Sequence, residues 1–485
     1  MNRIVIIGGG IAGLAAAYYA KKNIPDAYIV VIEADSHWGG KIMTDRVAFN
    51  DGQFIIEGGP DSFLATKPWG VALCKELGLA ERLNGTNPDQ KNTYVLKKGC
   101  LLPIPEGLTM MIPSDISSML RSHLISWFGK LRMGLDLLLP TKTNNGDESL
   151  GAFVSRRLGR EAYEKFIEPL MSGIYAGDGD QLSLLSTFPY LRDLEIKYGS
   201  LARGARQVRK QSNGQAVHGS RSAFLTPATG LAEVVESLIE NLSSNGATLC
   251  LDTRASRITR YSESGTWKTE FDTGESIGSE ALILATPAYV SGTLLASFDP
   301  DLASVLQNIP YASTATVSLA YPLSDVPRAL DGYGYVIPRR EGRKALACTW
   351  TTTKFPYRAP EGHALIRVFI GRAGQDIPWN ENELFELAKE ELNLTLGVTA
   401  EPLVSRVFMW DKAMPQYNLG HPEILNHIDA ALENHRGLAV AGNGYRGIGI
   451  PDCIHSGELA IEKVARDLSQ EPAKATGMSQ HIHSN

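Results

Sequence analysis

The first forty residues alternate between apolar runs and turn residues. Ile4 to Ile7 is a short apolar run typical of a buried strand, and Tyr28 to Ile32 is a second one. Between them lie apolar residues spaced as on one face of a helix. These residues are Ile11, Leu14, Ala15, Tyr18 and Tyr19. The pattern predicts strand, helix and strand in succession, which is the repeating unit of a parallel sheet.

Glycines and an acidic residue stand in this unit where a nucleotide would bind. Gly8, Gly10 and Gly13 have the G-x-G-x-x-G spacing, and Glu33 follows the second strand. Such glycines allow a tight turn, close approach of the backbone to a pyrophosphate, and close packing of helix on strand. The helix N-terminus favours phosphate charge, and the acid accepts hydrogen bonds from a ribose. The sequence therefore predicts a dinucleotide-binding unit.

The residues after Glu33 favour FAD over a nicotinamide cofactor. Glycine pairs stand at 39–40 and 58–59, and Lys41 follows the first pair. Paired glycines indicate backbone that passes close to a large flat ligand. The alternative is that Gly58-Gly59-Pro60 forms only a turn.

The C-terminal part repeats the order of strand, glycine-rich loop and helix. Residues 437–442 form a short apolar run flanked by glycines, and Pro451 suits the first turn of a helix. One face of that helix carries Ile454, Gly457, Ile461, Val464, Ala465 and Leu468. We expect this segment to return to the N-terminal unit and to cap the flavin end of FAD. An unrelated C-terminal strand and helix is the alternative.

The middle of the chain predicts a discontinuous α/β (α+β) fold. A helical stripe runs from Leu231 to Leu242, and apolar strands follow at 247–251 and 281–285. Further strand candidates lie at 314–320, 333–337, 345–351 and 364–370, whereas 89–198 is largely helical. The predicted divisions are 1–66, 199–290 and 434–470 for a Rossmann-like FAD-binding domain, 67–88 and 291–433 for a β-sheet substrate domain, 89–198 for an α-helical domain, and 471–485 for a disordered tail.

Two segments leave alternatives open. In 119–140, one helical face carries Leu120, Leu124, Trp127, Phe128, Leu131, Leu135 and Leu138, with Arg121, Lys130 and Arg132 among them. We expect a helix packed on the substrate domain, and the alternative is a face that touches anionic lipid. The basic, polar stretch 205–222 predicts a solvated loop, with gating of the substrate as its alternative.

Composition narrows the class of protein. Hydrophobic residues make up 43% and charged residues 21% of the 485 positions, as in ordinary globular proteins. The net charge of −6 argues against nucleic-acid binding. Five dispersed cysteines suit a reducing cytoplasm, and no apolar stretch is long enough to span a membrane. We expect no metal, since His481 and His483 in the tail are only a weak suggestion of one.

Eight strings in this order resemble the oxygen-dependent porphyrinogen oxidases, a family within the flavin amine oxidase superfamily. They include IVIIGGGIAGLAAAYY, EADSHWGGKI, EGGPDSF, IEPLMSGIYAGDGDQLSLLSTFP, WDKAMPQYNLGH and GIGIPDCIHSG. SGIYAGD and GIGIPDC look more like the Gram-positive coproporphyrinogen III oxidases than the mitochondrial protoporphyrinogen oxidases. The resemblance implies an FAD domain of the p-hydroxybenzoate hydroxylase type, a β-sheet substrate domain and an α-helical domain.

The resemblance also implies which residues contact FAD. They are Gly8, Gly9, Gly10, Ile11, Ala12, Gly13, Glu33, Ala34, Lys41, Gly59, Pro60, Asp61, Ser62, Ala255, Trp410, Ile448, Gly449 and Ile450. Ala255 departs from the family's usual valine, which a backbone contact to adenine tolerates. The alternative for Trp410 is a core position, which large aromatic residues occupy more often than cofactor contacts.

For the substrate, the resemblance implies an apolar slot lined by Gly173, Tyr333, Val336 and Phe369, with Lys67 near a substrate carboxylate. Core, turn and surface positions are the alternatives for these residues. No catalytic acid or base is implied, because a flavin accepts a hydride without a metal or a protein nucleophile.

The implied reaction is an FAD- and O2-dependent six-electron oxidation of coproporphyrinogen III to coproporphyrin III in haem biosynthesis, with H2O2 as by-product. Protoporphyrinogen IX oxidation is the close alternative. A flavin amine oxidase or desaturase, and a non-catalytic flavoprotein or porphyrin carrier, are the others. We expect a soluble cytoplasmic enzyme, with peripheral membrane contact and a transient partner such as ferrochelatase left open.

Overall fold

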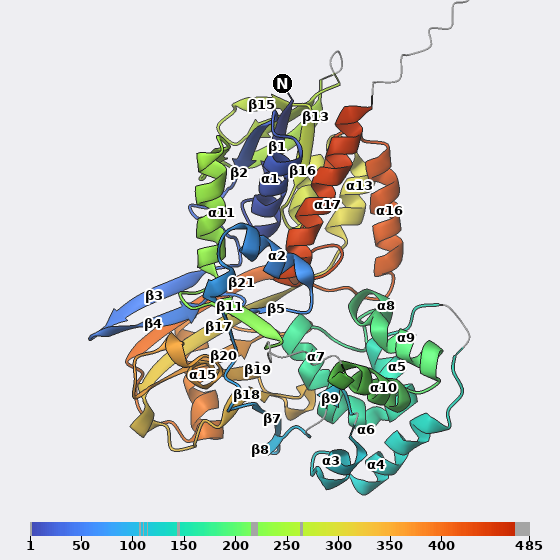
Figure 1. Cartoon of the computed structure of the whole chain (residues 1–485), viewed down its shortest axis with the longest axis vertical. Helices are drawn as coiled ribbons and strands as arrows, with labels where there is room; N and C mark the ends of the chain where they lie inside the picture. The colour runs from blue at the N-terminus through green and yellow to red at the C-terminus, as the bar shows by residue number, and fades with distance from the viewer. Residues whose placement is uncertain are drawn as a thin grey trace, which may run out of the picture.

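The computed structural model describes residues 2–105, 108–109, 111–113, 115–142, 146–214, 222–261 and 265–470. Figure 1 shows a part built on a parallel sheet at the top, a large second sheet at the lower left and a helical part at the lower right. The tail 471–485, with His481 and His483, lies outside the described residues.

A five-stranded parallel sheet forms the centre of the upper part. Its strands, in spatial order, are β12 (Thr248–Cys250), β2 (Tyr28–Ile32), β1 (Arg3–Ile7), β16 (Ala281–Leu284) and β22 (Leu438–Val440). The strands come from three separate stretches of the chain, and all are apolar because both faces are covered. The apolar runs at 4–7, 28–32, 247–251 and 281–285 are thus confirmed as strands.

Helices cover one face of this sheet, and a second layer covers the other. The first face packs against α1 (Ile11–Asn23), α2 (Pro68–Glu76), α11 (Ala232–Ser244) and α17 (Ile450–Ser469). The other face packs against β13 (Ala255–Arg260), β14 (Trp267–Phe271), β15 (Ser276–Ser279), α12 (Ala288–Leu295), α13 (Pro300–Gln307) and α16 (His421–Glu433). The C-terminal helix therefore returns to the N-terminal unit, as predicted (Figure 1).

The large sheet has seven strands. Their order is β21 (Val404–Pro415), β17 (Tyr311–Pro322), β20 (His363–Ile370), β19 (Ala345–Trp350), β18 (Gly332–Val336), β7 (Asn92–Lys97) and β8 (Cys100–Pro103). Neighbours are antiparallel except the pair β18 and β7. The helix α15 (Glu381–Leu396) covers one face, and the hairpin of β3 (Thr44–Phe49) and β4 (Gly52–Glu57) packs beside β17 and β20. All four strand predictions between 314 and 370 are confirmed.

The helical part has its own core. It contains α3 (Ile116–Arg121), α4 (Trp127–Gly134), α5 (Leu150–Leu158), α6 (Arg160–Ala162), a π-helical turn (Tyr163–Ile167), α7 (Glu168–Tyr175), α8 (Leu184–Thr187), α9 (Pro189–Tyr198) and α10 (Leu201–Gly214). Short elements join the parts: β5 (Phe63–Leu64), β6 (Leu83–Gly85), β9 (Leu108–Thr109), β10 (Ile112–Pro113), β11 (Phe224–Pro227), α14 (Thr351–Lys354) and 3-10 turns at 80–82, 135–137, 323–325, 339–341 and 356–358. None of the described helices is long and apolar enough to cross a bilayer.

Two sequence predictions for this part are wrong. Segment 119–140 is broken into α3, α4 and a 3-10 turn, and much of its apolar face lies in solvent rather than packed on the substrate domain. Residues 205–214 belong to α10 instead of a loop, since arginine, alanine and lysine favour a helix. Residues 215–221 of that predicted loop lie outside the described chain. Moreover, α10 packs against α9, β9 and β10.

Candidate active site

The turn between β1 and α1 contains glycines with two different structural roles. Gly8 has φ of +112°, and a Cβ there would lie 2.7 Å from the carbonyl oxygen of Ala285. A Cβ on Gly13 would lie 1.9 Å from the carbonyl oxygen of Gly8, so this glycine permits the close approach of helix and turn. Gly10, in contrast, has φ of −70° and nothing within 4 Å of a Cβ. The open space beside Gly10 lies where a pyrophosphate is expected.

The acid after β2 is held at the same turn. The carboxylate of Glu33 accepts hydrogen bonds from the backbone N–H groups of Gly9 (2.7 Å) and Asp35 (2.9 Å). The N–H of Thr253 donates to the carbonyl of Glu33, and Ala255 begins β13 two residues later. The predicted ribose acid and the predicted adenine contact therefore lie in adjoining segments, as do Ala34 and the loop at 250–253.

Lys41, directly after the glycine pair at 39–40, is a desolvated cation. Its burial lowers the pKa of the ammonium group, which lies near the buried Cys453 thiol. Among the described residues, no carboxylate forms an ion pair with it. Burial raises the pKa of the Cys453 thiol to about 12, so that group stays neutral. A desolvated ammonium group beside the open Gly10 turn suits a phosphate-bearing ligand.

Helices α1 and α17 pack side by side, with the first turns of α1 against the middle of α17. A Cβ on Gly457 would lie 2.4 Å from the carbonyl oxygen of Ala12, so the two helices pack with backbone nearly in contact. Gly449 caps α17, Ile450 is its first residue, and Ile448 packs against the core of the helical part. Two helix N-termini thus point toward the junction of the three parts (Figure 1), where their partial positive charge favours electron-rich ligand atoms.

Three side chains from the large sheet converge on one carbonyl. The Gly58 carbonyl oxygen accepts hydrogen bonds from Thr316 Oγ1 (2.7 Å), Trp410 Nε1 (2.9 Å) and Arg367 Nη2 (3.0 Å). Arg367 also donates to the carbonyl of Gly59, where a Cβ would lie 1.9 Å from the carbonyl oxygen of Lys41. Sequence analysis missed Thr316 and Arg367. Their signal is strand alternation, since both lie on the sheet face that carries Phe369 and Trp410.

The turn after Gly59 is held by charge. Lys354 Nζ lies 2.8 and 3.1 Å from the two carboxylate oxygens of Asp61, and Ser62 Oγ donates to the same carboxylate (2.6 Å). Burial alone would raise the pKa of Asp61, but the Lys354 ammonium and the Arg367 guanidinium outweigh it and hold this pKa well below its usual range. Burial lowers the pKa of Arg367 to about 10, against the opposing effect of Asp61. The segment that includes Pro60 is thus fixed before any ligand binds.

Three of the predicted substrate residues, Gly173, Val336 and Phe369, lie together. Val336, Ala347 and Phe369 are cross-strand neighbours on β18, β19 and β20. Val336 and Phe369 pack with Ala347, Leu346 and Ala176. Ala176 directly follows the last residue of α7 and caps this helix. A Cβ on Gly173 would meet only Val336 Cγ1, at 3.8 Å. The space beside Gly173 therefore has an apolar wall and room for a further group.

Buried charge anchors α7 to the large sheet. Glu168, its first residue, accepts a hydrogen bond from the N–H of Arg339 (3.2 Å) and lies 3.7 Å from the Arg372 guanidinium. Burial raises the pKa of Glu168, and these two arginines only partly oppose it. At the other end of α7, the N–H of Ala373 donates to the carbonyl of Ala176 (2.7 Å). A π-helical turn precedes Glu168, a feature common at functional sites.

The remaining two predicted substrate residues are engaged elsewhere. Gly334, with φ of +131°, interrupts the register of β18, and the Tyr333 hydroxyl donates to Thr86 Oγ1 and the Asn87 carbonyl, both at 2.9 Å. Lys67 Nζ lies 2.6 Å from both carboxylate oxygens of Asp452, in the first turn of α17. Lys67 is thus at the end of α17 that faces the junction, with 40% of its side chain exposed.

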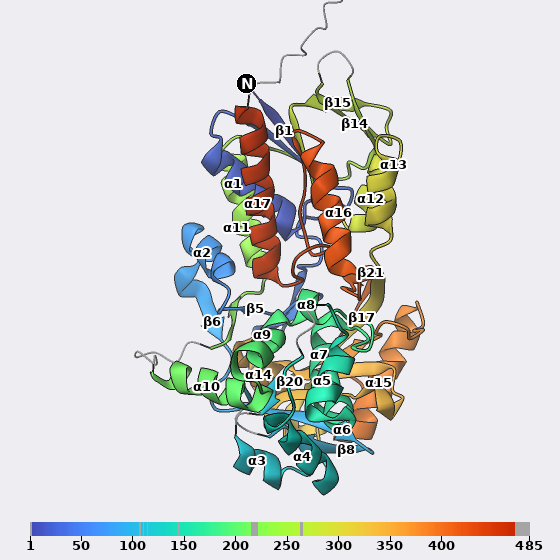
Figure 2. The ribbon, with the colours of Figure 1, turned by 90° about the vertical axis from the view of Figure 1, so that its right-hand side faces the viewer.

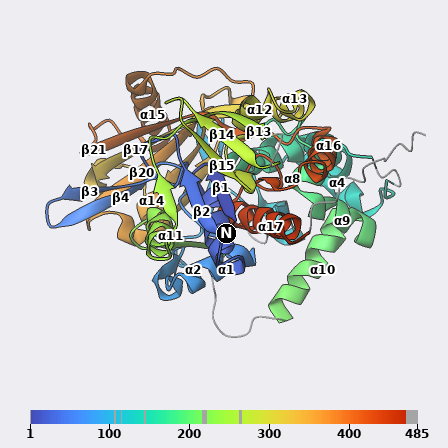
Figure 3. The ribbon, with the colours of Figure 1, turned by 90° about the horizontal axis from the view of Figure 1, so that it is seen from above.

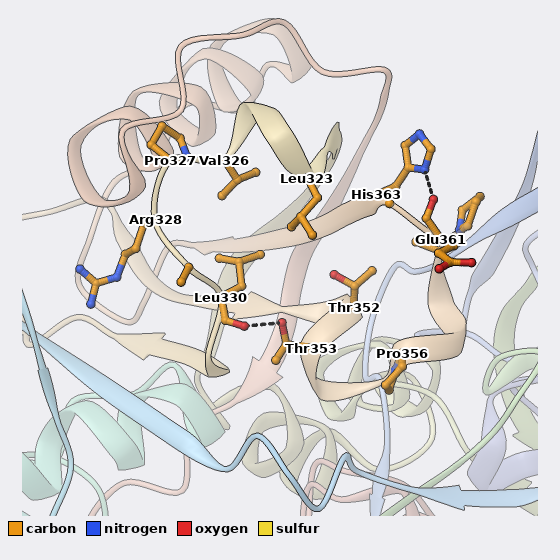
Figure 4. Close-up of a pocket in the computed structure, with 14 residues that line it drawn as sticks. Leu323, Val326, Pro327, Arg328, Leu330, Thr352, Thr353, Pro356, Glu361 and His363 are labelled. Carbon is orange, nitrogen blue, oxygen red and sulfur yellow. Dashed lines mark hydrogen bonds between the residues drawn. The ribbon is translucent and has the colours of Figure 1, made fainter.

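A cavity of about 740 Å³ lies elsewhere, on the large sheet (Figure 4). It is lined by residues of the loop after β17 and of the segment from α14 to the start of β20, such as Leu323, Leu330, Thr353 and His363. None of the residues predicted to bind cofactor or substrate lines it, so this cavity is not the candidate active site. Within the described residues, no cluster of His, Cys, Asp and Glu is arranged to hold a metal ion.

The chain is similar to known proteins over nearly its whole length. The family model described as flavin containing amine oxidoreductase matches residues 11–465. Coproporphyrinogen III oxidase from Bacillus subtilis (strain 168) is 37% identical over 95% of this chain and 97% of its own. Coproporphyrinogen III oxidase from Staphylococcus aureus (strain NCTC 8325 / PS 47) is 35% identical over 96% and 99%. A crystal structure from Exiguobacterium sp. 255-15, described as a candidate protoporphyrinogen oxidase, superposes with a TM-score of 0.83 at 34% identity, covering 97% of this chain and 99% of its own.

Proposed function

Because the chain belongs to the flavin-containing amine oxidoreductase family, we propose that it is an FAD- and O2-dependent oxidase that converts coproporphyrinogen III to coproporphyrin III in haem biosynthesis. The assignment of the substrate rests on the nearly full-length similarity to two relatives named coproporphyrinogen III oxidase. That similarity covers 95% of this chain for the first relative and 96% for the second.

The residues at the junction fit FAD. We assign the pyrophosphate to the open turn at Gly10 with Lys41 as counter-charge, and the ribose of the adenosine half to Glu33. The N-terminus of α17, from Ile448 to Ile450, would face the flavin half, with the turn at Gly59 beneath it. When bound, FAD supplies the acceptor for hydride from the substrate, and O2 regenerates it with formation of H2O2.

The residues of this chain would bind and orient the substrate and exclude water from it. Val336 and Phe369 offer an apolar wall for a tetrapyrrole, and Gly173 leaves room for the macrocycle to lie against the helix backbone. We assign Lys67 to a propionate of the substrate. On binding, this propionate would replace Asp452 as the partner of the Lys67 ammonium group. No acid or base of the chain is required, because one pyrrole N–H proton would leave to solvent with each of the three hydrides, and tautomerisation of the remaining meso C–H would complete the conjugation.

Protoporphyrinogen IX is the second candidate substrate, favoured by the similarity to the Exiguobacterium structure. The two substrates differ in charge, since coproporphyrinogen III carries four propionates and protoporphyrinogen IX two. A preference for the first therefore requires more cations at the rim of the site. Of the cations near the junction, Lys67 is substantially exposed, whereas Lys354 is largely buried and paired with Asp61.

We also infer which of the three parts binds the cofactor and which binds the substrate. The parallel sheet with α1, α11 and α17 would hold FAD, the seven-stranded sheet would bind substrate, and the helical part would close the site through α7. We place the helical part at about 104 to 214, and the packing of α10 on α9 and the pairing of β7 with β18 support this division. We expect the enzyme in the cytoplasm, where a ferrochelatase-type enzyme would be the transient partner that takes its product.

The test is porphyrin fluorescence in air, with coproporphyrinogen III and protoporphyrinogen IX offered in parallel to the flavin-loaded protein. We expect coproporphyrin to form faster than protoporphyrin, together with H2O2. Faster protoporphyrin formation would favour the second candidate, and no fluorescence above autoxidation from either would refute both.

A matched pair of variants tests the substrate site. Gly173→Leu should abolish turnover and retain FAD, because its side chain would fill the space beside Val336. Ile196→Ala, at an exposed position of α9, should leave turnover unchanged. Full turnover by Gly173→Leu would remove this residue from the site.

A further inference from the structure

Segment 416–421 lies between the two sides of the candidate site. It follows β21 and ends at His421, the first residue of α16. Gln416, Tyr417 and His421 are buried, with 3%, 0% and 1% of their surface exposed. Figure 2 shows α8 below the N-terminal ends of α16 and α17, and Figure 3 shows α8 between these two helices from above. The segment therefore lies where the helical part meets the end of α17 that we assign to the flavin.

One phenol holds both ends of the loop that leads into α17. The Tyr417 hydroxyl donates to the carbonyl of Asn443 (2.5 Å) and accepts a hydrogen bond from the N–H of Gly447 (3.0 Å). Gly447 has φ of +112°, and a Cβ there would lie 2.5 Å from Cγ of Asp452, so the loop folds tightly onto the first turn of α17. The N–H of Gly449 donates to the same carboxylate (3.2 Å). The backbone that enters α17 is thus held between the Tyr417 phenol and the Asp452 carboxylate.

A histidine holds the middle of the same loop. His421 Nε2 donates to the carbonyl of Tyr445 (2.8 Å), and Nε2 carries the proton because a carbonyl can only accept. Burial lowers the pKa of His421, and the Arg446 guanidinium adds to this effect, so the imidazole is neutral. The imidazole stacks on the Tyr417 ring, with 4.2 Å between the ring centres and 13° between the planes. Three backbone groups of 443–447 are therefore hydrogen-bonded to two stacked rings.

The same segment also holds the end of α7. Gln416 Nε2 donates to the carbonyl of Tyr175 (3.0 Å), the last residue of α7, and the Tyr175 ring meets the Tyr417 ring edge-on at 6.1 Å between centres. The N–H of Ser183, which caps α8, donates to the carbonyl of Tyr417 (2.8 Å). Ile448 packs in the same core as Tyr175 and Tyr417. One buried segment therefore joins the helix assigned to the substrate to the loop assigned to the flavin.

We propose that Tyr417 and His421 are positioning residues that set the N-terminus of α17 against the flavin at a fixed offset from α7. They act through the backbone of 443–447 and need not touch the flavin. The N-terminus of a helix carries partial positive charge, which stabilises the electron-rich reduced flavin more than the oxidised flavin. The inference rests on the proposed function in one respect, that this end of α17 faces the flavin, and it does not depend on which substrate is oxidised.

The test is the reduction potential of the flavin in Tyr417→Phe, measured by anaerobic reduction of the flavin-loaded full chain beside a reference dye. This variant keeps both stacked rings and removes only the hydroxyl. We expect the affinity for reduced relative to oxidised flavin to fall by about tenfold, which for a two-electron couple lowers the potential by about 30 mV. We also expect kcat to fall by about tenfold with KM unchanged, because the flavin and the substrate would lose their alignment.

Tyr94→Phe is the matched control. Tyr94 is a buried tyrosine of the large sheet, and its hydroxyl donates to the Asp331 carboxylate (2.8 Å). The control should lower the melting temperature about as Tyr417→Phe does and leave the flavin potential and kcat as in wild type. A wild-type potential and kcat in Tyr417→Phe would overturn the proposal even if its melting temperature falls, since Tyr417 would then serve the core alone.

A second pair of variants keeps the test decisive if Tyr417→Phe folds poorly. His421→Leu removes the donor to the Tyr445 carbonyl and should lower the flavin potential in the same direction. His421→Gln retains an N–H donor of similar reach and should restore most of the wild-type potential. Equal shifts in the two His421 variants would contradict a role through this hydrogen bond.

The neighbouring Gln416 tests the substrate side of the same segment. Gln416→Leu should raise the KM for coproporphyrinogen III by about fivefold, the effect of about one hydrogen bond, and leave the flavin potential unchanged. A shift of the potential as large as in Tyr417→Phe would contradict the separate roles of the two residues. If neither porphyrinogen is oxidised, the proposed function fails, and the potentials of the Tyr417 and His421 variants still decide whether these residues position the flavin-facing loop.

Discussion

Alanine substitutions at two glycines of the same motif should have different effects. At Gly10 the substitution should weaken FAD binding, and at Gly13 it should destabilise the fold. At Gly10 the backbone has φ of −70° and nothing lies within 4 Å of a Cβ, so Gly10→Ala should change the stability of the flavin-free protein by less than about 1 kcal/mol. That methyl group would occupy the space assigned to the pyrophosphate. We expect the dissociation constant of FAD to rise by about tenfold or more, which is about 1.4 kcal/mol.

Gly13→Ala should instead damage the apoprotein. Its Cβ would lie 1.9 Å from the carbonyl oxygen of Gly8, far inside van der Waals contact, and that oxygen belongs to the backbone and cannot rotate away. Such overpacking costs about 1–3 kcal/mol or more. Melting temperatures of the flavin-free proteins and fluorescence titration with FAD separate the two effects. Unchanged FAD affinity in Gly10→Ala would refute the assignment of the pyrophosphate to this turn.

Three further predictions concern buried polar groups. Burial raises the pKa of Glu391 from 4.5 to about 7, so its protonated form is favoured in the fold and stability falls as pH rises between these values. Glu391→Gln should therefore gain up to about 3 kcal/mol on wild type between pH 5 and pH 8 in thermal melts, and parallel pH curves for the two proteins would contradict this. Arg157→Met leaves the buried Asp136 without its cationic partner and should cost about 3–5 kcal/mol by the same melts, whereas the exposed Arg121→Met should cost little. Trp410→Phe removes the indole donor to the Gly58 carbonyl and should weaken FAD binding several-fold in a fluorescence titration, because a hydrogen bond of this kind contributes about 1 kcal/mol; unaltered affinity would show that this donor does not serve the cofactor.

Local patterns predicted most of the architecture. The apolar runs before Gly8 and at 281–285 are adjacent strands of one sheet, and the periodic stripe at Leu231–Leu242 is α11. The error at 119–140 has a physical cause. Periodicity reports that a face is apolar but not whether anything covers it, and here the covered face is the one with Ile125 and Met133. At α10 a polar, basic composition concealed good helix formers.

Some residues of the candidate site could likewise be identified from sequence alone, and others could not. Gly8, Gly13 and Glu33 are close in sequence and mark the turn by their spacing alone. Arg367 reaches Gly58 across 309 positions, and Lys354 reaches Asp61 across 293, so no local pattern signals either contact. These long-range partners depend on how the sheet meets the nucleotide-binding part, which only the folded chain reveals.

The most direct test of the proposed function is an anaerobic titration of the flavin-loaded protein with coproporphyrinogen III. Absorbance follows loss of oxidised flavin while fluorescence counts coproporphyrin. Because the reaction removes six electrons and FAD accepts two, the account predicts three flavins reduced for each coproporphyrin formed. Admission of O2 should then restore the oxidised flavin with formation of H2O2. Flavin that remains oxidised while coproporphyrin forms only at the rate of autoxidation would contradict the account.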